Sequence, residues 1–153
     1  TSGVKLVNNK YISAIKNKLF KNLSLLTPNI PEAEIISGMN ILNVNDMIIA
    51  ARRILKLGPK NVLIKGGHLK NNYLFDVLIN KKFLKIYKNK KIKSRNTHGT
   101  GCTLSSAIAT YYSCGKDIKS SCYLAIKYVN DAIRTAPNYG KGNGPINHLN
   151  NRK

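Results

Sequence analysis

The feature that most constrains the fold of this chain is an alternation of helix-like and strand-like segments along its length. Apolar residues recur at helical spacing in segments 9–22, 31–38, 46–57, 103–113 and 117–135. Short apolar or alternating runs, typical of strands, occupy residues 23–27, 61–65, 73–79, 83–87 and 91–93. This alternation predicts the α/β class: a layered fold with a largely parallel sheet, whose edge is formed by the basic strands between residues 73 and 95.

The ends of the predicted helices are marked by capping residues. Pro31 suits the first turn of a helix that Gly38 ends. Asn45 is the expected N-cap of the next helix, which stops before Gly58. The segment from residue 137 to residue 153 is rich in Gly and Asn, and it is predicted to be a loop.

The length of 153 residues fits one domain that can bury a real core. Because the chain begins at Thr1 rather than Met, we expect a processed product or a piece of a longer chain. It has no apolar run of the roughly 20 residues that a membrane span needs, and no apolar signal-peptide core. The cysteines, Cys102, Cys114 and Cys122, are odd in number and lack metal-ligand spacing, which favours reduced thiols in a cytoplasmic compartment. Cys114 and Cys122 are expected to be buried structural thiols.

The charge balance is strongly basic, with 26 Lys and Arg against 6 Asp and Glu and a formal net charge of +20. The densest basic stretch, Lys81 to Arg95, is a candidate nucleic-acid-binding module, because clustered cations release counterions from a phosphate backbone. Apolar residues alternate through this stretch, however, and Lys, Asn and Ile are abundant along the whole chain, as an AT-biased codon supply would produce. We therefore favour strands with one solvated face, in a chain whose field attracts anionic substrates.

A glycine-rich run, Asn96-Thr97-His98-Gly99-Thr100-Gly101-Cys102, precedes the predicted helix 103–113. Its glycines allow neighbouring backbone N–H groups to point toward one anion, which the positive N-terminal end of the helix would also face. Cys102 stands at the junction, where a thiol loses its proton most readily. The run predicts a phosphate cradle with an ionisable group at its edge; the alternative is that Cys102 is a buried structural thiol.

Two further loops follow predicted strands, and ligands collect at the carboxyl ends of strands in open α/β sheets. Glu32 could bind Mg²⁺ directly or through water, or simply complement a helix dipole. Lys65 and the two glycines after it could approach a nucleotide phosphate, or they could form an ordinary turn. His68 and His98 are candidate acids or bases, although a loop His more often only donates or accepts a hydrogen bond. The carboxylates available for such roles are those of Glu32, Glu34, Asp46, Asp76, Asp117 and Asp131.

Taken in order, four stretches resemble the ribokinase-like family, and more closely the hydroxymethylpyrimidine/phosphomethylpyrimidine kinases of thiamine biosynthesis. They read TPNIPEAE (27–34), VLIKGGHL (62–69), NTHGTGCTLS (96–105) and, at the family's C-terminal signature, GKGNGPINH (140–148). The resemblance runs over nearly the whole chain. The family's kinases are about 100 residues longer than a single domain of this chain's length. It implies that residues 1–153 are the C-terminal part of one ribokinase-like kinase domain, the half with the nucleotide site and the catalytic loop.

The resemblance assigns the phosphoryl-transfer chemistry to the glycine-rich run. Gly99, Thr100 and Gly101 resemble the family's anion hole, whose backbone N–H groups neutralise charge developing on the transferred phosphoryl group. Cys102 occupies the position of the family's base, which accepts the proton of the substrate hydroxymethyl group.

The resemblance also implies ATP and Mg²⁺ as cofactors. Asn29 and Glu32 match the family's N-x-x-E motif, in which Glu32 helps to organise Mg²⁺ near the ATP phosphates. Lys65 and Thr97 are expected to lie near the same phosphates. The nucleotide-binding residues implied in this way are Asn29, Lys65 and Thr97.

The cysteine narrows the implied substrate. Most ribokinase-like sugar kinases carry Asp at the position of Cys102, so the thiol favours a pyrimidine kinase, with a pyridoxine- or pyridoxal-type kinase as the near rival. The family's N-terminal half, which holds most of the pyrimidine contacts, has no match here and would be a partner if it is separately encoded. The remaining interpretations are an inactive copy and the nucleic-acid-binding module at Lys81 to Arg95; a homo-oligomer is compatible with each, and no membrane partner is expected.

Overall fold

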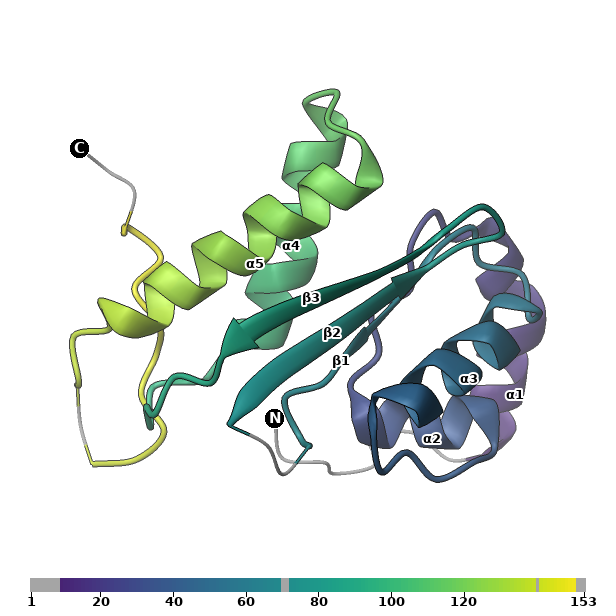
Figure 1. Ribbon diagram of the computed structural model, residues 1–153, viewed down its shortest axis with the longest axis horizontal. Coiled ribbons are helices and arrows are strands. Elements are labelled where there is room, and N and C mark those ends of the chain that lie inside the picture. Colours follow the sequence, from purple (N-terminus) through teal and green to yellow (C-terminus); the bar gives the residue numbers. More distant parts are fainter. Residues whose placement is uncertain (1–8, 70–71, 140, 151–153) are drawn as a thin grey trace. The chain divides into compact units, whose positions relative to one another are not determined.

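The computed structural model describes residues 9–69, 72–139 and 141–150. These residues divide into two compact units, with the boundary between Lys91 and Ile92 (Figure 1). The first unit has helices and a sheet, and the second has a pair of helices and a long C-terminal segment.

The unit that ends at Lys91 combines helices with a small sheet. Its helices are α1 (Asn9–Lys18), the short 3₁₀ helix η1 (Phe20–Asn22), α2 (Ile30–Ser37) and α3 (Val44–Leu55). Its strands are β1 (Val62–Lys65), β2 (Tyr73–Ile79) and β3 (Leu84–Lys90), in the spatial order β1-β2-β3. The α/β class is therefore confirmed, and β3, part of the basic stretch, forms an edge of this sheet.

Both strand pairs in the sheet are antiparallel, so the expected largely parallel sheet is not confirmed. The connections explain the difference. A turn joins β2 to β3, in which the Asn80 side chain accepts the N–H groups of Lys82 and Phe83 at 2.8 and 3.0 Å. The β1–β2 connection, 66–72, is also shorter than the dozen or so residues that a parallel crossover needs. Beside β1, the described residues show parallel pairing only as isolated bridges, Leu26 to Val62 and Asn29 to Lys65, and the strand expected at 23–27 is reduced to the first of these.

The core of this unit lies between α2, α3 and one face of the sheet (Figure 1). Side chains at every second position of β1 and β2 point to this face, because successive residues of a strand alternate. The fully or almost fully buried members include Ala33 on α2, Met47, Ala50, Ala51 and Ile54 on α3, and Val62, Ile64, Val77 and Ile79 on the strands.

The start of α3 differs from the prediction. Asn43, not Asn45, is the N-cap, because its backbone is extended and its side chain accepts the N–H of Asp46 at 3.0 Å. The Asp46 carboxylate accepts the N–H of Leu42 in return, at 2.9 Å. The preceding helix follows the prediction closely, since α2 has Pro31 in its first turn and Gly38 as its left-handed C-cap.

The unit that begins at Ile92 is built on two packed helices, α4 (Thr100–Ser113) and α5 (Ile118–Arg134). α4 starts three residues earlier than expected, so Thr100, Gly101 and Cys102 belong to its first turn. Asp117 caps α5 by accepting the N–H groups of Lys119 and Ser120. The buried apolar side chains of these helices include Leu104, Ile108, Cys122, Ala125, Ile126, Val129 and Ala132.

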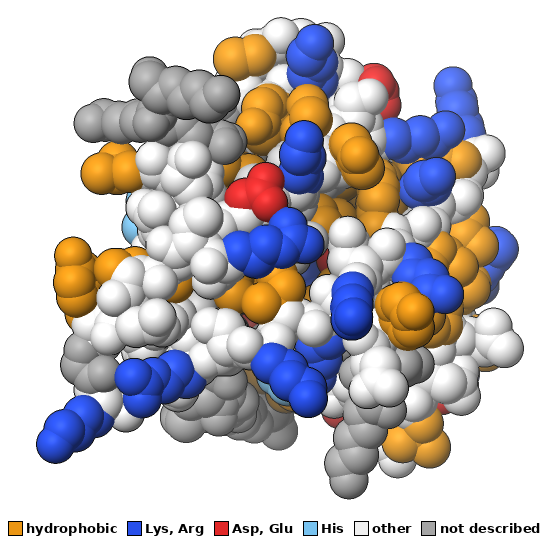
Figure 2. Space-filling view, turned by 60° about the vertical axis from the view of Figure 1, so that its left-hand side comes forward, with side chains coloured by type: hydrophobic (Ala, Val, Ile, Leu, Met, Phe, Trp, Pro, Cys, Tyr) orange, Lys and Arg blue, Asp and Glu red, His pale blue; other side chains and the backbone are white. Residues whose placement is uncertain are grey.

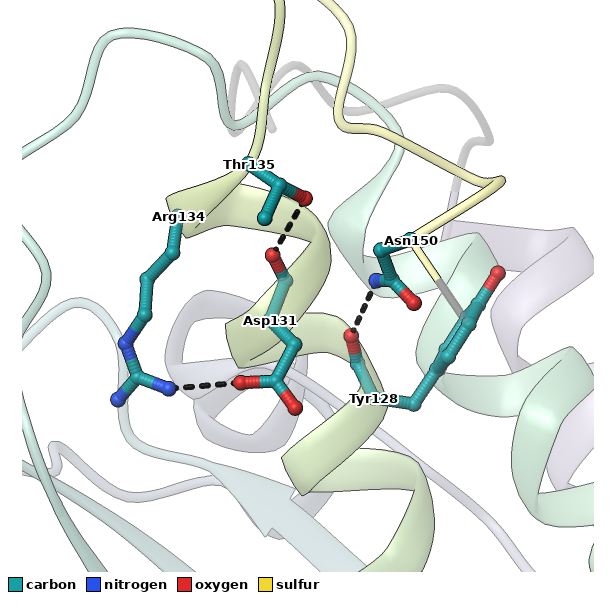
Figure 3. A network of polar contacts seen from close by, with 5 residues as sticks. All are labelled: Tyr128, Asp131, Arg134, Thr135 and Asn150. Atoms are coloured by element: carbon teal, nitrogen blue, oxygen red, sulfur yellow. Dashed lines mark hydrogen bonds and ion pairs between the residues drawn. The ribbon is translucent and has the colours of Figure 1, made fainter. Parts of the chain in front are cut away.

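The C-terminal segment is loop, as predicted, but it is tied to the last turns of α5 (Figure 3). The Asn150 side chain donates to the Tyr128 carbonyl at 3.1 Å, and the Tyr128 hydroxyl donates to the His148 carbonyl at 2.8 Å. In the same turns Asp131 pairs with Arg134 at 2.8 Å, and its carbonyl accepts the Thr135 hydroxyl. The two contacts of Tyr128 hold the segment along α5.

The burial of the three cysteines differs in part from the prediction. Cys122 is buried, as expected, but Cys114 is exposed because it is the C-cap residue at the end of α4. Cys102 is exposed as well, so the alternative of a buried structural thiol at this position is wrong. No helix among the described residues is long and apolar enough to cross a membrane.

Candidate active site

The loop before α4 turns sharply into the helix at Gly99. This residue is the N-cap and has a φ of 83°, a left-handed conformation that favours glycine. The Thr97 carbonyl accepts the Thr100 hydroxyl at 3.0 Å, and the Gly99 carbonyl accepts both the N–H and the hydroxyl of Thr103 at 2.9 Å. The backbone direction at the start of α4 is therefore fixed by local hydrogen bonds.

Two backbone donors at this helix end are available for an anion. Within the described part of the chain, no hydrogen bond engages the N–H groups of Gly101 and Cys102, whereas the Thr100 N–H makes a long one of 3.4 Å to Thr97. The first N–H groups of a helix lack intrahelical partners, and the helix dipole places about half a positive charge there. Backbone N–H groups at a helix N-terminus are able to bind an anion.

Cys102 lies on the first turn of α4 and lines an open pocket of about 490 Å³. The pocket runs along α4 past α5 to the C-terminal segment, all within one unit. Hydroxyl and aromatic groups dominate its wall, which consists of Cys102, Thr103, Ser106, Ala107, Thr110, Tyr111, Tyr128 and His148. The thiol is therefore accessible and adjacent to the free N–H groups in sequence.

The glycine-rich C-terminal segment contacts the loop before α4 and supports it. The His98 N–H donates to the Gly144 carbonyl at 3.2 Å, next to a parallel bridge between His98 and Pro145. The side-chain amide of Asn96, which is buried, donates to the side-chain oxygen of Asn138. From the sequence, this segment was predicted to be a loop and matched a family signature, but nothing in its composition indicated the contact with the loop before α4.

In the other unit, Asn29 and Glu32 form a reciprocal capping box at the start of α2. The Asn29 side chain accepts the Glu32 N–H at 2.9 Å, and Glu32 Oε2 accepts the Asn29 N–H at 2.7 Å. The Glu32 side chain is exposed, so its carboxylate can also reach a ligand. Both roles expected for Glu32, the helix end and the ligand, are thus compatible with its position.

Lys65 lies beside this cap. Its N–H donates to the Pro28 carbonyl at 2.9 Å, and it forms the parallel bridge with Asn29. The two glycines after Lys65 begin a turn closed by the Leu69 N–H and the Gly66 carbonyl at 3.1 Å, and His68 is exposed on it. The structure therefore brings together Asn29, Glu32 and Lys65 in one unit, and Thr97, Gly99, Thr100, Gly101 and Cys102 in the other.

Sequence reasoning listed Asp76 only as an available carboxylate, but the structure gives it a distinct environment. It is 4% exposed, and its Oδ1 accepts the N–H of Gly66 at 3.0 Å. Burial raises the pKa of Asp76 to about 6, while the Gly66 N–H and the charge of Lys65 act in the opposite direction. The signal in the sequence was an acidic residue inside an otherwise apolar strand, Tyr73–Ile79.

The basic stretch Lys81 to Arg95 lies largely along β3, and its lysines are exposed. One of them, Lys88, is placed over the Tyr73 ring, 4.2 Å from its centroid. In Figure 2, the Lys and Arg side chains of the visible face are dispersed among hydrophobic and uncharged ones. Nucleic-acid binding by this stretch stays an untested alternative.

Among the described residues, no group of three or more His, Cys, Asp or Glu side chains could form a metal site of its own. Any Mg²⁺ here would have to share its ligands with phosphate and water. That is the usual way in which proteins bind this ion, through one or two carboxylates and several waters.

The chain has the α/β fold of part of a ribokinase-like protein. Its structure is similar to that of the pyridoxal kinase from Staphylococcus aureus in complex with AMP-PCP and pyridoxal, with a TM-score of 0.91 and 28% identity. The similarity covers 98% of this chain and 57% of that one. By sequence, residues 1–147 match the phosphomethylpyrimidine kinase family, and the chain belongs to it.

The curated relatives include a kinase of this name and a bifunctional protein of thiamine biosynthesis. The hydroxymethylpyrimidine/phosphomethylpyrimidine kinase of Aquifex aeolicus is 40% identical over 141 residues, which are 92% of this chain and 55% of the relative. The thiamine biosynthesis bifunctional protein ThiED of Geobacter sulfurreducens is 44% identical over 147 residues, or 96% of this chain and 30% of that protein. This chain therefore spans about half, or less, of the length of these relatives.

Proposed function

We propose that this chain is the C-terminal portion of an ATP-dependent kinase that phosphorylates hydroxymethylpyrimidine and then its monophosphate in thiamine biosynthesis. The observation that carries the proposal is the start of α4, where the free N–H groups of Gly101 and Cys102 adjoin an accessible thiol. Family membership supports the choice of substrate. Pyridoxal, which is named for the S. aureus structural neighbour, is the alternative substrate.

In the proposed reaction, Cys102 as thiolate accepts the proton of the substrate hydroxymethyl group. The substrate oxygen then bonds to the γ-phosphorus, and the bond from that phosphorus to the bridging oxygen breaks, leaving its electron pair on ADP. The backbone donors of the Gly99–Cys102 turn stabilise charge on the transferred phosphoryl oxygens. Such preorganised donors need no rearrangement as the charge develops.

Nucleotide binding is assigned to Asn29, Lys65 and Thr97, with Glu32 toward Mg²⁺. One Glu32 oxygen is held by the Asn29 N–H, which fixes the carboxylate at the exposed start of α2 and fits an ion that takes its other ligands from water and phosphate. When bound, Mg²⁺ supplies positive charge that neutralises the phosphate oxygens. Lys65 adds a point charge of the kind that binds phosphate.

The proposal is tested at Cys102, in a chimera that joins this chain to the portion of the A. aeolicus relative outside the match. Cys102→Ala should lower kcat for hydroxymethylpyrimidine by about 100-fold or more, because general-base catalysis contributes on that scale. AMP-PCP binding should stay within about two-fold, as the thiol is not assigned to the nucleotide.

The matched control is Cys114→Ala, which removes the other exposed thiol of α4 at the opposite end of the helix. This variant should turn over at the parent rate. Parent-like turnover by Cys102→Ala would show that another group is the base. A chimera that phosphorylates pyridoxal in preference to hydroxymethylpyrimidine would replace the proposed substrate with its rival.

A further inference from the structure

One buried carboxylate, Asp76, has no part in that mechanism. It projects from β2 toward the face of the sheet opposite α2 and α3, since its neighbour Val77 belongs to the core between the sheet and these two helices. Its direct cross-strand neighbours are Lys65 on β1 and Tyr87 on β3. The other acidic side chains of the chain are exposed or half-buried, so Asp76 is in a different environment from all of them.

Asp76 accepts a hydrogen bond from a backbone N–H group that lies just beyond the end of a strand. β1 ends at Lys65, and the next N–H, that of Gly66, donates to Asp76 Oδ1 at 3.0 Å in a buried setting. A buried N–H without an acceptor costs about 1–3 kcal/mol, and a charged acceptor makes a stronger bond than a neutral one. The carboxylate therefore fixes the point at which the chain leaves β1.

The backbone at this point is tightly enclosed. A Cβ at Gly66 would lie 1.9 Å from the Phe75 carbonyl oxygen and 3.3 Å from Met47 Cε on α3. At Gly67, by contrast, the nearest atom to a Cβ would be Leu74 Cδ1 at 4.0 Å. The turn thus has one anchored residue, Gly66, followed by one with open space around it.

We propose that Asp76 is a positioning residue, which anchors the turn from Lys65 to Leu69 so that the Lys65 side chain and the turn backbone are held ready for nucleotide phosphates. The proposal rests on the function assigned above, because the phosphate role of Lys65 is part of it. The negative charge of Asp76 has a second effect, since it lies directly across the strand pair from Lys65 and offsets that cation when no phosphate is bound.

The anchor depends on the ionisation of Asp76. A protonated carboxyl accepts the Gly66 N–H less strongly than a carboxylate does. Because the pKa of this group is raised to about 6, the anchored form dominates at neutral pH and is lost as the pH falls through that value. The titratable groups that face Asp76 from neighbouring strands are Lys65 and Tyr87.

The first test follows the Gly66 amide by NMR in the ¹⁵N-labelled chain, from about pH 8 down to about pH 5. The amide proton should shift with a midpoint near 6 in the parent chain, and this transition should be absent in Asp76→Asn. The amide of Gly38, which donates to the Glu34 carbonyl, is the internal reference. If the parent Gly66 amide shows no such transition, the anchor does not exist, and this measurement needs no variant to fold.

The second test measures AMP-PCP binding by calorimetry at about pH 8, where the parent Asp76 is ionised. Asp76→Asn should raise the Kd about ten-fold, whereas the matched control Asp131→Asn, which removes a carboxylate paired with Arg134 on α5, should leave it unchanged. Parent-like binding by a folded Asp76→Asn overturns the positioning role. Absence of AMP-PCP binding by the chimera as well as by this chain would overturn the proposed function itself, and the positioning role with it, even where the Gly66 amide titrates.

Discussion

The Glu32 carboxylate has a structural role in a helix cap and a proposed role toward Mg²⁺. One of its oxygens closes the capping box with Asn29, a role that the N-x-x-E spacing also suits on purely structural grounds. The side chain is nevertheless exposed at a helix N-terminus, where a ligand can reach it. Because Gln can take the same place in a capping box, the two roles can be separated by substitution.

We expect Glu32→Gln to keep the stability of the chain within about 0.5 kcal/mol, because the amide oxygen still accepts the Asn29 N–H. The same variant should need about ten-fold more Mg²⁺ for half-maximal activity in the chimera, since a neutral amide is a poor ligand for this ion. Glu32→Ala should lose both the cap, at about 1 kcal/mol of unfolding free energy, and the Mg²⁺ response. Urea unfolding and Mg²⁺ titration measure the two effects, and an unchanged Mg²⁺ requirement in Glu32→Gln would leave Glu32 with the cap alone.

Some residue-level properties could be predicted from the sequence because they depend on neighbours along the chain. The roles of Pro31 and Gly38 at the ends of α2 are of this kind. The burial of Asp76 is not, because it depends on a partner ten positions away, Gly66, and on two neighbouring strands. An acidic residue in an apolar strand run is the only local sign of such a site.

At the scale of secondary-structure elements, the loop before α4 depends on the C-terminal segment. Gly144 lies against this loop so closely that a Cβ there would be 2.2 Å from Asn96 Oδ1 and 3.3 Å from the Tyr139 carbonyl. The same Gly144 accepts the His98 N–H through its carbonyl. A side chain at Gly144 would therefore push on Asn96, which is 2% exposed.

We expect Gly144→Ala to lower the kcat/KM of the chimera by about ten-fold or more, because overpacking costs on the order of 1–3 kcal/mol and here displaces the loop that carries the backbone donors. Gly142→Ala is the matched control: it lies two residues away in the same segment, and its Cβ would meet no atom within 4 Å. Steady-state kinetics of both variants make the comparison. Equal kinetics would mean that the loop holds its position without this contact.

Element prediction succeeded where the helical or alternating pattern was long, as for β2, whose bounds match those predicted, and for α5. It failed at two kinds of place. Cys102 was expected before the helix, but the left-handed Gly99 lets α4 begin at Thr100. The largely parallel sheet was also not confirmed, because connection length decides strand direction, and the sequence indicated a ligand loop rather than a hairpin connection between β1 and β2.

At the scale of the whole molecule, the chain carries the helix start that we propose as a backbone anion site, but it spans 55% of its A. aeolicus relative. The open pocket beside Cys102 lies on the helix that starts with that anion site. We propose that the remaining part of the kinase domain, on the same polypeptide or on another, covers this pocket and supplies the pyrimidine contacts. The net charge of +20 would favour binding of the anionic nucleotide.

Complementation tests this proposal directly. The portion of the A. aeolicus relative outside the match, produced as a separate polypeptide, should restore hydroxymethylpyrimidine phosphorylation when it is mixed with this chain, and neither piece alone should exceed about 1% of the chimera's rate. This result is expected because base and backbone donors act only on a substrate held in place by the rest of the pocket. The same mixture made with Cys102→Ala should be inactive, which excludes activity from the added piece. Full activity of this chain alone would contradict the proposal, because it would show that the pocket along α4 binds the substrate without further residues.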